Sequence, residues 1–225
     1  PVPAITVAQL TEPVTHLLLA TKAQDAAAAL ESVSPFLAAD ARIILLQNGL
    51  RQLELARQWA DKRVYCLSTS HGAWLSSRFH VVHAGIGETR LGQPDGRGDG
   101  RGDDRGDGES DCQALLAQLP ADSMHIRCDH NIADRLWRKF AVNCAANALT
   151  VVHNCSNGEL LTIPAARQQL LALCAEIERI MGAIPGAPAF PVFPEVERVL
   201  QATAANFSST LQDVRKGKAT ELPEL

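Results

Sequence analysis

The sequence predicts a chain of two parts, a partial Rossmann-type parallel α/β sheet followed by an all-helical second domain. In the first part, short apolar runs alternate with helical patterns, which is typical of parallel strands joined by crossover helices. In the second part, long helical patterns predominate. We place the boundary near residue 128, with a partial nicotinamide-cofactor domain over residues 1–128 and a helical substrate domain over residues 129–225.

The first part supplies the elements of the predicted sheet. The apolar runs are the strands, at Leu17–Ala20, Arg42–Leu46 and Val64–Leu67. The amphipathic stretches between them are helices, at Asp25–Leu37 and Leu50–Trp59. We expect a small appended hairpin that pairs Phe79–His83 with Thr89–Leu91.

A low-complexity segment, PDGRGDGRGDDRGDGE, interrupts this pattern at residues 94–109. Glycine, aspartate and arginine cannot bury a core, so we expect a solvated loop. It contains three Arg-Gly-Asp tripeptides, beginning at Arg97, Arg101 and Arg105, of the kind that adhesion receptors recognise. A repeat-expanded linker is the better interpretation in an intracellular protein, and the spacing of a calcium-binding loop is missing.

Three helices are predicted after the loop. The first is Asn131–Val152, and the second is Thr162–Gly182, with Thr162 as its N-cap and Pro164 in its first turn. The third is Glu195–Val214, whose apolar face comprises Val196, Val199, Leu200, Thr203, Phe207, Leu211 and Val214.

The composition is that of an ordinary globular protein, 46% hydrophobic and 20% charged. A net charge of −4 disfavours nucleic acid and anionic membranes as partners, because both require a basic patch. Apolar runs are too short to span a bilayer and the N-terminus has no signal-peptide pattern. We therefore expect a cytoplasmic protein.

Six cysteines are scattered without a Cys-x-x-Cys pair, at positions 66, 112, 128, 144, 155 and 174. This spacing suggests neither a zinc cluster nor a disulfide framework, and we expect no metal site. Several cysteines lie in apolar runs, so buried thiols in a reducing compartment are expected.

Polar residues follow each predicted strand: Thr21-Lys22, Gln47-Asn48-Gly49 and Ser70-His71-Gly72-Ala73. Ordinary turns are also polar, so each segment alone has a plain structural interpretation. In open parallel sheets, however, ligands bind outside the carboxyl ends of the strands, and these three segments share that edge.

The first long helix carries the strongest indication of a ligand site. Between Phe140 and Leu149 every residue except two asparagines is apolar, and Lys139, Asn143 and Asn147 recur every four positions as one polar stripe. Burying these groups without partners costs several kcal/mol. Either a protein network or a bound polar ligand satisfies them, and we favour a ligand cleft. A lysine in apolar surroundings can also donate a proton, because burial disfavours its charged form.

Four segments together resemble, in order and spacing, the ketopantoate reductase family. They are LLQNG (45–49), LWRKFAVNCAANALT (136–150), NCSNGEL (154–160), and NFSSTLQD (206–213) followed by TEL (220–222). The resemblance implies a 2-dehydropantoate 2-reductase, which reduces ketopantoate to pantoate with NADPH in pantothenate biosynthesis.

The resemblance also implies roles for residues. Lys139 would donate the proton to the ketone oxygen. The implied substrate contacts are Asn48, Asn143, Asn147, Asn157, Ser209, Thr210, Leu211 and Gln212. The implied cofactor contacts are Lys22, Asn48, Ala73 and Glu221.

The sequence departs from the family at both ends. The family opens with a strand and a Gly-x-Gly-x-x-Gly turn, and it continues into further helix after the residue that matches Glu221. Neither feature occurs in these 225 residues, where Gly85-Ile86-Gly87 is followed by Arg90 in place of the third glycine. We therefore expect a chain cut short at both ends.

The alternative is a catalytically silent paralogue that acts as a helical interaction module. Helical second domains often dimerise, so a homodimer is a further prediction.

Overall fold

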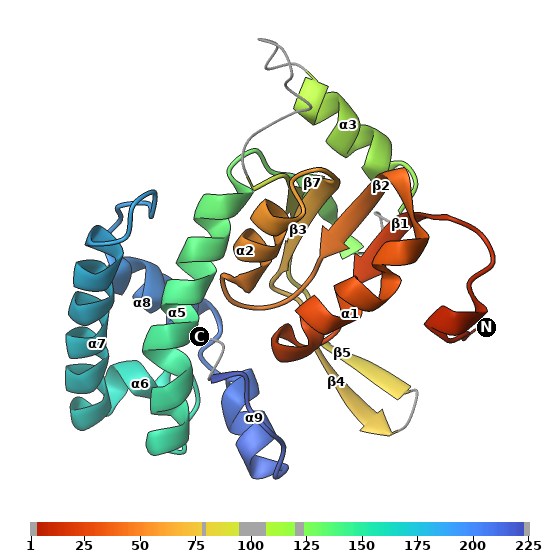
Figure 1. The fold of residues 1–225 in the computed structure, drawn as a ribbon. Helices are drawn as coiled ribbons and strands as arrows, with labels where there is room; N and C mark the ends of the chain where they lie inside the picture. The colour runs from red at the N-terminus through yellow and green to blue at the C-terminus, as the bar shows by residue number, and fades with distance from the viewer. Residues whose placement is uncertain (1–3, 78–79, 95–106, 120–123, 223–225) are drawn as a thin grey trace. The chain divides into compact units, whose positions relative to one another are not determined.

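The computed structural model describes residues 4–77, 80–94, 107–119 and 124–222 (Figure 1). The chain divides into an N-terminal unit, residues 1–133, and a C-terminal unit, residues 134–225. The predicted fold class is confirmed: a mixed, mainly parallel sheet with helices is followed by a helical domain. Among the described residues no helix is both long and apolar enough to cross a bilayer.

The N-terminal unit is built on a five-stranded sheet with the strand order β1-β2-β3-β6-β7. The strands are β1 (Val14–Leu19), β2 (Leu37–Leu45), β3 (Arg63–Thr69), β6 (Thr89–Gly92) and β7 (Ile126–Cys128). β1, β2 and β3 are parallel neighbours, with Leu19 opposite Leu45 and Leu45 opposite Cys66. Their carboxyl ends therefore lie at one edge of the sheet.

Helices cover both faces of this sheet, and the alternation of strand residues decides which helix lies on which face. Ile43, Leu45 and Val64 pack with α1 (Ala26–Val33) and α2 (Arg51–Gln58). Ile44, Tyr65 and Leu67 point the other way and pack with α3 (Asp107–Leu116). The short 3₁₀ helices are η1 (Val7–Gln9), η2 (Ala23–Asp25) and η3 (Ser34–Phe36).

The predicted hairpin is wrong. β5 (His80–Gly85) pairs antiparallel with β4 (Gly72–Ser77), whereas β6 pairs with β3 and β7 of the main sheet. Phe79 lies outside the described residues. Gly87 makes the return to the main sheet possible, because a Cβ there would lie 2.5 Å from the carbonyl carbon of Ser70.

The low-complexity segment lies largely outside the described residues, since α3 begins at Asp107 and the described chain before it ends at residue 94. α3 itself was not expected from the sequence. It is anchored to the sheet by Asp111, which accepts hydrogen bonds from Tyr65, Arg42 (2.7 Å) and Arg63 (3.2 Å). Burial acts to raise the pKa of Asp111, but the bonds from Tyr65 and Arg42 and the two arginine charges outweigh it, so this pKa lies below its ordinary value.

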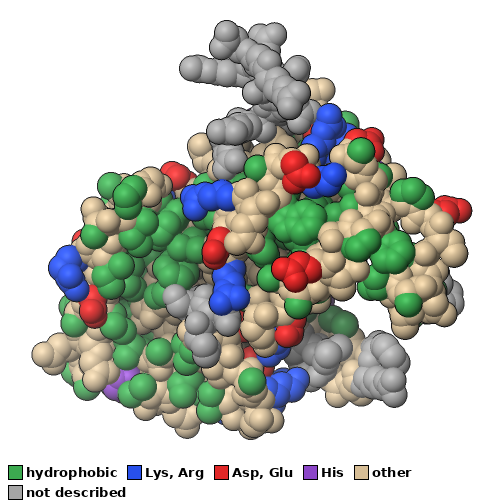
Figure 2. Space-filling view, in the orientation of Figure 1, with side chains coloured by type: hydrophobic (Ala, Val, Ile, Leu, Met, Phe, Trp, Pro, Cys, Tyr) green, Lys and Arg blue, Asp and Glu red, His purple; other side chains and the backbone are tan. Residues whose placement is uncertain are grey.

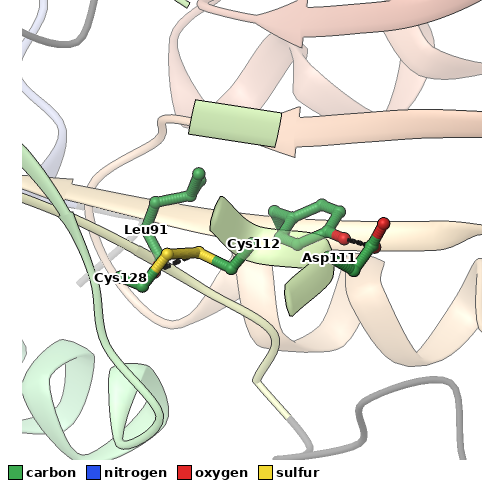
Figure 3. Close-up of a disulfide and its surroundings, with 5 residues drawn as sticks. Leu91, Asp111, Cys112 and Cys128 are labelled. Atoms are coloured by element: carbon green, nitrogen blue, oxygen red, sulfur yellow. Dashed lines mark hydrogen bonds between the residues drawn. A yellow bond between two sulfur atoms is a disulfide. The ribbon is translucent and has the colours of Figure 1, made fainter. Parts of the chain in front are cut away.

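A disulfide joins Cys112 of α3 to Cys128 of β7 (Figure 3), with their Cα atoms 6.1 Å apart. The expectation that the cysteines are thiols is therefore wrong for this pair. The two residues are 16 positions apart, and only the packing of α3 beside β7 brings them within the range that a disulfide needs. Cys66, Cys144, Cys155 and Cys174 are free thiols.

Reducing this disulfide should lower the melting temperature of the chain. Closing a loop of this length contributes about 3 kcal/mol, which corresponds to roughly 6–12 °C for a chain of this size. We expect dithiothreitol to lower the melting temperature of the parent chain and of Cys174→Ala, which alters a buried free thiol. The Cys112→Ala/Cys128→Ala double variant should show no such response. Equal responses in all three proteins would show that the bond does not form in solution.

The C-terminal unit consists of α5 (Ile132–Val152), α6 (Glu159–Thr162), α7 (Pro164–Gly182), α8 (Val192–Ala202) and α9 (Ser209–Arg215). α5 matches the predicted first helix, and α5 to α8 share one core around Ala145, Leu160, Leu170 and Val196. Figure 2 shows apolar side chains gathered over the part of the surface that this unit presents. Exposed large apolar residues here include Val152, Ile180, Phe207 and Val214. A homodimer stays a prediction.

The start of the second helix in this unit differs from the prediction. Thr162 is not the N-cap of the second helix but the last residue of α6. The residue preceding α7 is Ile163, held in extended conformation before Pro164.

The predicted third helix, Glu195–Val214, is two helices. α8 ends at Ala202 and α9 begins at Ser209, and Phe207 and Val214 are exposed rather than on a common buried face. The carbonyls of Ala204 and Asn206, between the two helices, accept hydrogen bonds from Gly158 and Asn157. These bonds hold the connecting residues in a turn, which a periodicity argument could not detect.

Candidate functional site

The predicted site residues of the N-terminal unit lie at the carboxyl edge of the sheet. Lys22 and Asn48 each stand three residues beyond a pair of neighbouring strand residues, Leu19 and Leu45, so the structure brings both to the same edge. Lys22 is exposed and Asn48 is half-buried. Ala73 is an exposed residue of β4.

Gln47 of this edge has a structural role. Its buried side-chain nitrogen donates to the carbonyls of Leu19 (2.8 Å) and Thr21 (3.2 Å), and Gln52 donates to the carbonyl of Gln47 (2.7 Å). These bonds join the ends of β1 and β2 to the start of α2. Gly49, with φ of +84°, makes the sharp entry into that helix.

Three histidines surround the third strand end. The amide of Gly87 donates to His71 Nδ1 (3.2 Å), so this nitrogen is an acceptor and Nε2 carries the proton given to the Met124 carbonyl (3.1 Å). His83 Nε2 lies 2.9 Å from the same Nδ1, and His125 stacks on His71. This network fixes the start of β4, which carries Ala73.

A hollow of about 200 Å³ lies between the η2–α1 segment and α2. It is lined by Ala23, Ala27, Arg51, Glu54, Leu55 and Gln58. Its charged and apolar walls belong to α1, α2 and η2 rather than to any residue predicted to bind a ligand.

The polar stripe of the C-terminal unit lies along α5. Lys139, Asn143 and Asn147 are each half-buried, whereas Ala141, Val142, Ala145, Ala146 and Leu149 are buried in the helical core. At 1.5 Å per residue the stripe is roughly 12 Å long.

Lys139 has an unusual protonation equilibrium. Burial lowers its pKa to about 8, and the negative charge of Glu221 opposes this effect in part. The residue keeps some solvent exposure as a whole, yet its amine is desolvated by its surroundings. Glu221, which the resemblance implies as a cofactor contact, thus acts electrostatically on Lys139. An amine of this kind is charged at neutral pH and gives up its proton readily.

Asn157 is held within the protein. Its side-chain nitrogen donates to Thr203 Oγ1 (2.8 Å), and Thr203 donates to the carbonyl of Val199 (2.7 Å). Gly158 follows, where a Cβ would lie 2.7 Å from the Cβ of Ala204. A ligand contact by Asn157 would therefore use its second amide hydrogen or its oxygen.

The four residues from Ser209 to Gln212 form the first turn of α9. Thr210 and Leu211 are buried, and the Gln212 side chain donates to the carbonyl of Phe207 (3.0 Å). Ser209 is exposed. Of these four side chains, the Ser209 hydroxyl is therefore the best placed to meet a ligand.

Two buried hydroxyls near the stripe were not predicted. Thr150 is completely buried and lies 2.6 Å, oxygen to oxygen, from Ser208. Thr150 stands three residues after Asn147 and so continues the stripe by one helical turn, a spacing that the sequence already contained. The partner Ser208 comes from another helix and could not be found from the sequence.

Two family models match the chain. One, described as "Ketopantoate reductase PanE/ApbA", matches residues 1–96, and "Ketopantoate reductase PanE/ApbA C terminal" matches residues 131–225. Among curated proteins, the 2-dehydropantoate 2-reductase of Vibrio cholerae is 34% identical over 209 residues, covering 92% of this chain and 66% of the relative. The enzyme of that name from Escherichia coli O157:H7 is 32% identical, covering 92% and 63%. The chain thus spans about two thirds of their length or slightly less.

Solved structures share the fold. A PanE/ApbA family ketopantoate reductase from Ralstonia eutropha JMP134 superposes with a TM-score of 0.76 at 23% identity, over 95% of this chain and 67% of the other. A D-mandelate dehydrogenase with NADH and anilino(oxo)acetate gives a TM-score of 0.79 at 20% identity, over 97% and 69%. At these identities the likeness concerns the fold alone.

Proposed function

The chain belongs to the ketopantoate reductase family, and we propose from this premise that it supplies the catalytic and substrate residues of a 2-dehydropantoate 2-reductase. The reaction would reduce ketopantoate to pantoate with NADPH, as a step of pantothenate biosynthesis in the cytoplasm. The observation that carries the proposal is the stripe on α5, where a lysine with a pKa of about 8 lies in line with two half-buried asparagines.

Reduction of a ketone needs a hydride at carbon and a proton at oxygen. NADPH, when bound, supplies the hydride to the carbonyl carbon. As negative charge grows on the carbonyl oxygen, the Lys139 ammonium stabilises it and then donates its proton to that oxygen. The product is the 2-hydroxy acid, and the neutral lysine regains a proton from water.

The asparagines would position the substrate. Asn143 and Asn147 offer amide donors and acceptors along the same line as Lys139, which suits the ketone of ketopantoate and the hydroxyl two carbons away from it. Asn48 and Asn157 add further amides. Ser209 and the turn through Thr210, Leu211 and Gln212 would hold the carboxylate, with the exposed Ser209 hydroxyl as the direct donor.

The residues that the resemblance implies as cofactor contacts would form only part of an NADPH site. Lys22 offers an exposed cation for a phosphate, and Asn48, Ala73 and Glu221 would contact the nicotinamide side. A Gly-x-Gly-x-x-Gly turn, which lets the backbone approach a pyrophosphate, does not occur in the 225 residues. The second candidate is a catalytically silent helical interaction module.

An activity assay separates the two candidates. The chain would be extended to the full length of its relatives with the flanking segments of the Vibrio cholerae protein, and NADPH consumption would be followed with ketopantoate. Turnover that depends on ketopantoate supports the reductase. A folded, extended protein without turnover, whose melting temperature NADPH leaves unchanged, supports the silent module, because a ligand of the folded state must raise that temperature.

Asn143→Ala in the extended protein should raise KM with little change in kcat. A residue that only holds the substrate contributes equally to the ground state and the transition state. Loss of one hydrogen bond of about 1.5 kcal/mol corresponds to roughly a tenfold rise. Steady-state kinetics measure both constants, and Asn143→Gln serves as a variant that keeps the amide. A fall in kcat at unchanged KM would contradict this assignment.

A further inference from the structure

The hydroxyls of Thr150 and Ser208 form a buried pair between the end of α5 and the start of α9. Their oxygens lie 2.6 Å apart, and the two residues are 0% and 8% exposed, which places the contact out of reach of water. The pair joins residues 58 positions apart in the chain.

Each hydroxyl of the pair has one proton, which fixes the direction of the hydrogen bonds. Thr150 Oγ1 donates its single proton to the carbonyl of Asn147 (2.7 Å), so the proton between the two hydroxyls comes from Ser208. Ser208 Oγ in turn accepts from the amide of Leu211 (3.1 Å), as the N-cap of α9. The bonds therefore run in one direction, from the Leu211 amide through both hydroxyls to the backbone of Asn147.

These hydrogen bonds connect Asn147, at the end of the polar stripe, to the Ser209–Gln212 turn. The other end of α9 is held as well, because Arg215 donates twice to Asn154 Oδ1 (3.2 and 2.8 Å). Both ends of α9 are thus tied to the last turn of α5 and the residues after it. Without the hydroxyl of Thr150, the Ser208 proton would lose a buried acceptor, and the turn would lose its connection to Asn147.

We propose that Thr150 and Ser208 are positioning residues, which hold the carboxylate-binding turn Ser209–Gln212 at a fixed distance from Asn147. The inference rests on the proposed function, because it assigns the two ends of the substrate to the two elements that the pair connects. Neither hydroxyl touches the substrate. Their effect is to set the spacing between the amide that meets one end of the 2-keto acid and the serine that meets its carboxylate.

The test uses the 225-residue chain and nuclear magnetic resonance. Ketopantoate is titrated while the side-chain amide of Asn147 and the backbone amide of Ser209 are followed, and hydrogen exchange of the Leu211 amide is measured in the free protein. We expect Thr150→Val to weaken ketopantoate binding about tenfold and to speed Leu211 exchange about tenfold. Thr150→Ser, which keeps the hydroxyl, should stay within about twofold of the parent in both. Ser208→Ala should behave like Thr150→Val.

Thr162→Val is the matched control. Its hydroxyl also donates to a carbonyl three residues back, that of Glu159, but Thr162 is an exposed residue of α6. This variant should leave both readouts unchanged even if it melts slightly earlier. Parental binding and parental Leu211 exchange in folded Thr150→Val would overturn the inference. If the parent bound no ketopantoate, the substrate role of the pair would fall, while the activity of the extended protein would still decide the proposed function. Leu211 exchange would still decide whether the hydroxyls hold the turn.

Discussion

Lys139→Ala in the protein extended to the full length of its relatives should lower kcat by roughly 10²- to 10⁴-fold, the usual contribution of a positioned general acid. The ammonium both stabilises the developing oxyanion and supplies its proton, so its effect appears in the chemical step rather than in binding. Stopped-flow measurement of NADPH consumption at saturating ketopantoate gives this rate directly. The pKa of about 8 makes Lys139 a ready donor near neutral pH.

The pH dependence of kcat follows from the protonation of Lys139. Lys139 donates a proton only while it is charged, so the rate should fall as pH rises through about 8. The Lys139→Ala variant should lack this limb of the profile, because no other group then supplies the proton in the same step. An unshifted lysine, at about 10.4, would place the limb more than two pH units higher.

A stability control distinguishes catalysis from folding. The pKa of Lys139 is lower in the folded state than in the unfolded state, so the folded protein is penalised for holding the charged amine and gains stability as pH rises from about 8 towards 10.4. Lys139→Met, which keeps the length of the side chain, should therefore melt no earlier than the parent at neutral pH. A folded Lys139→Ala protein with near-parental kcat would falsify the assignment of Lys139 as proton donor.

The second large effect concerns the cofactor: the 225-residue chain alone should bind NADPH only very weakly. Backbone amides of a glycine-rich turn at a helix N-terminus provide most of the contacts to a pyrophosphate in such folds, and these residues contain no such turn. Isothermal titration calorimetry should show no binding at micromolar NADPH. The extended protein should bind at least about a hundredfold more tightly, a difference of about 2.7 kcal/mol.

Lys22→Ala tests a cofactor contact that the 225 residues do contain. In the extended protein it should weaken NADPH binding, because Lys22 is an exposed cation at the carboxyl edge of the sheet. Lys62→Ala, which removes an ammonium that donates to the Ala39 carbonyl elsewhere on this unit, should leave binding unchanged. Micromolar binding of NADPH by the 225-residue chain itself would refute the prediction.

Local patterns in the sequence were sufficient for the central elements. The three parallel strands follow from compact apolar runs, and α5 follows from a pattern that runs without interruption from Ile132 to Val152. The stripe of Lys139, Asn143 and Asn147 follows from the helical repeat alone, because residues four apart on one helix must share a face. The assignment to the ketopantoate reductase family also came from ordered motifs and is confirmed by the family models.

Contacts between distant segments were decided only by the tertiary structure. Cys112 and Cys128 become a disulfide because α3 packs beside β7, and β6 joins the main sheet because Gly87 lets the chain pass close to Ser70. The turn between α8 and α9 exists because backbone groups of Asn157 and Gly158 bind its carbonyls. Periodicity in the sequence shows which face of a helix or strand is apolar. A hydrogen bond or a disulfide depends on which other segment of the chain packs against that face. The pKa of Lys139 has the same origin, since burial and the charge of Glu221 are properties of the packed chain rather than of the residue.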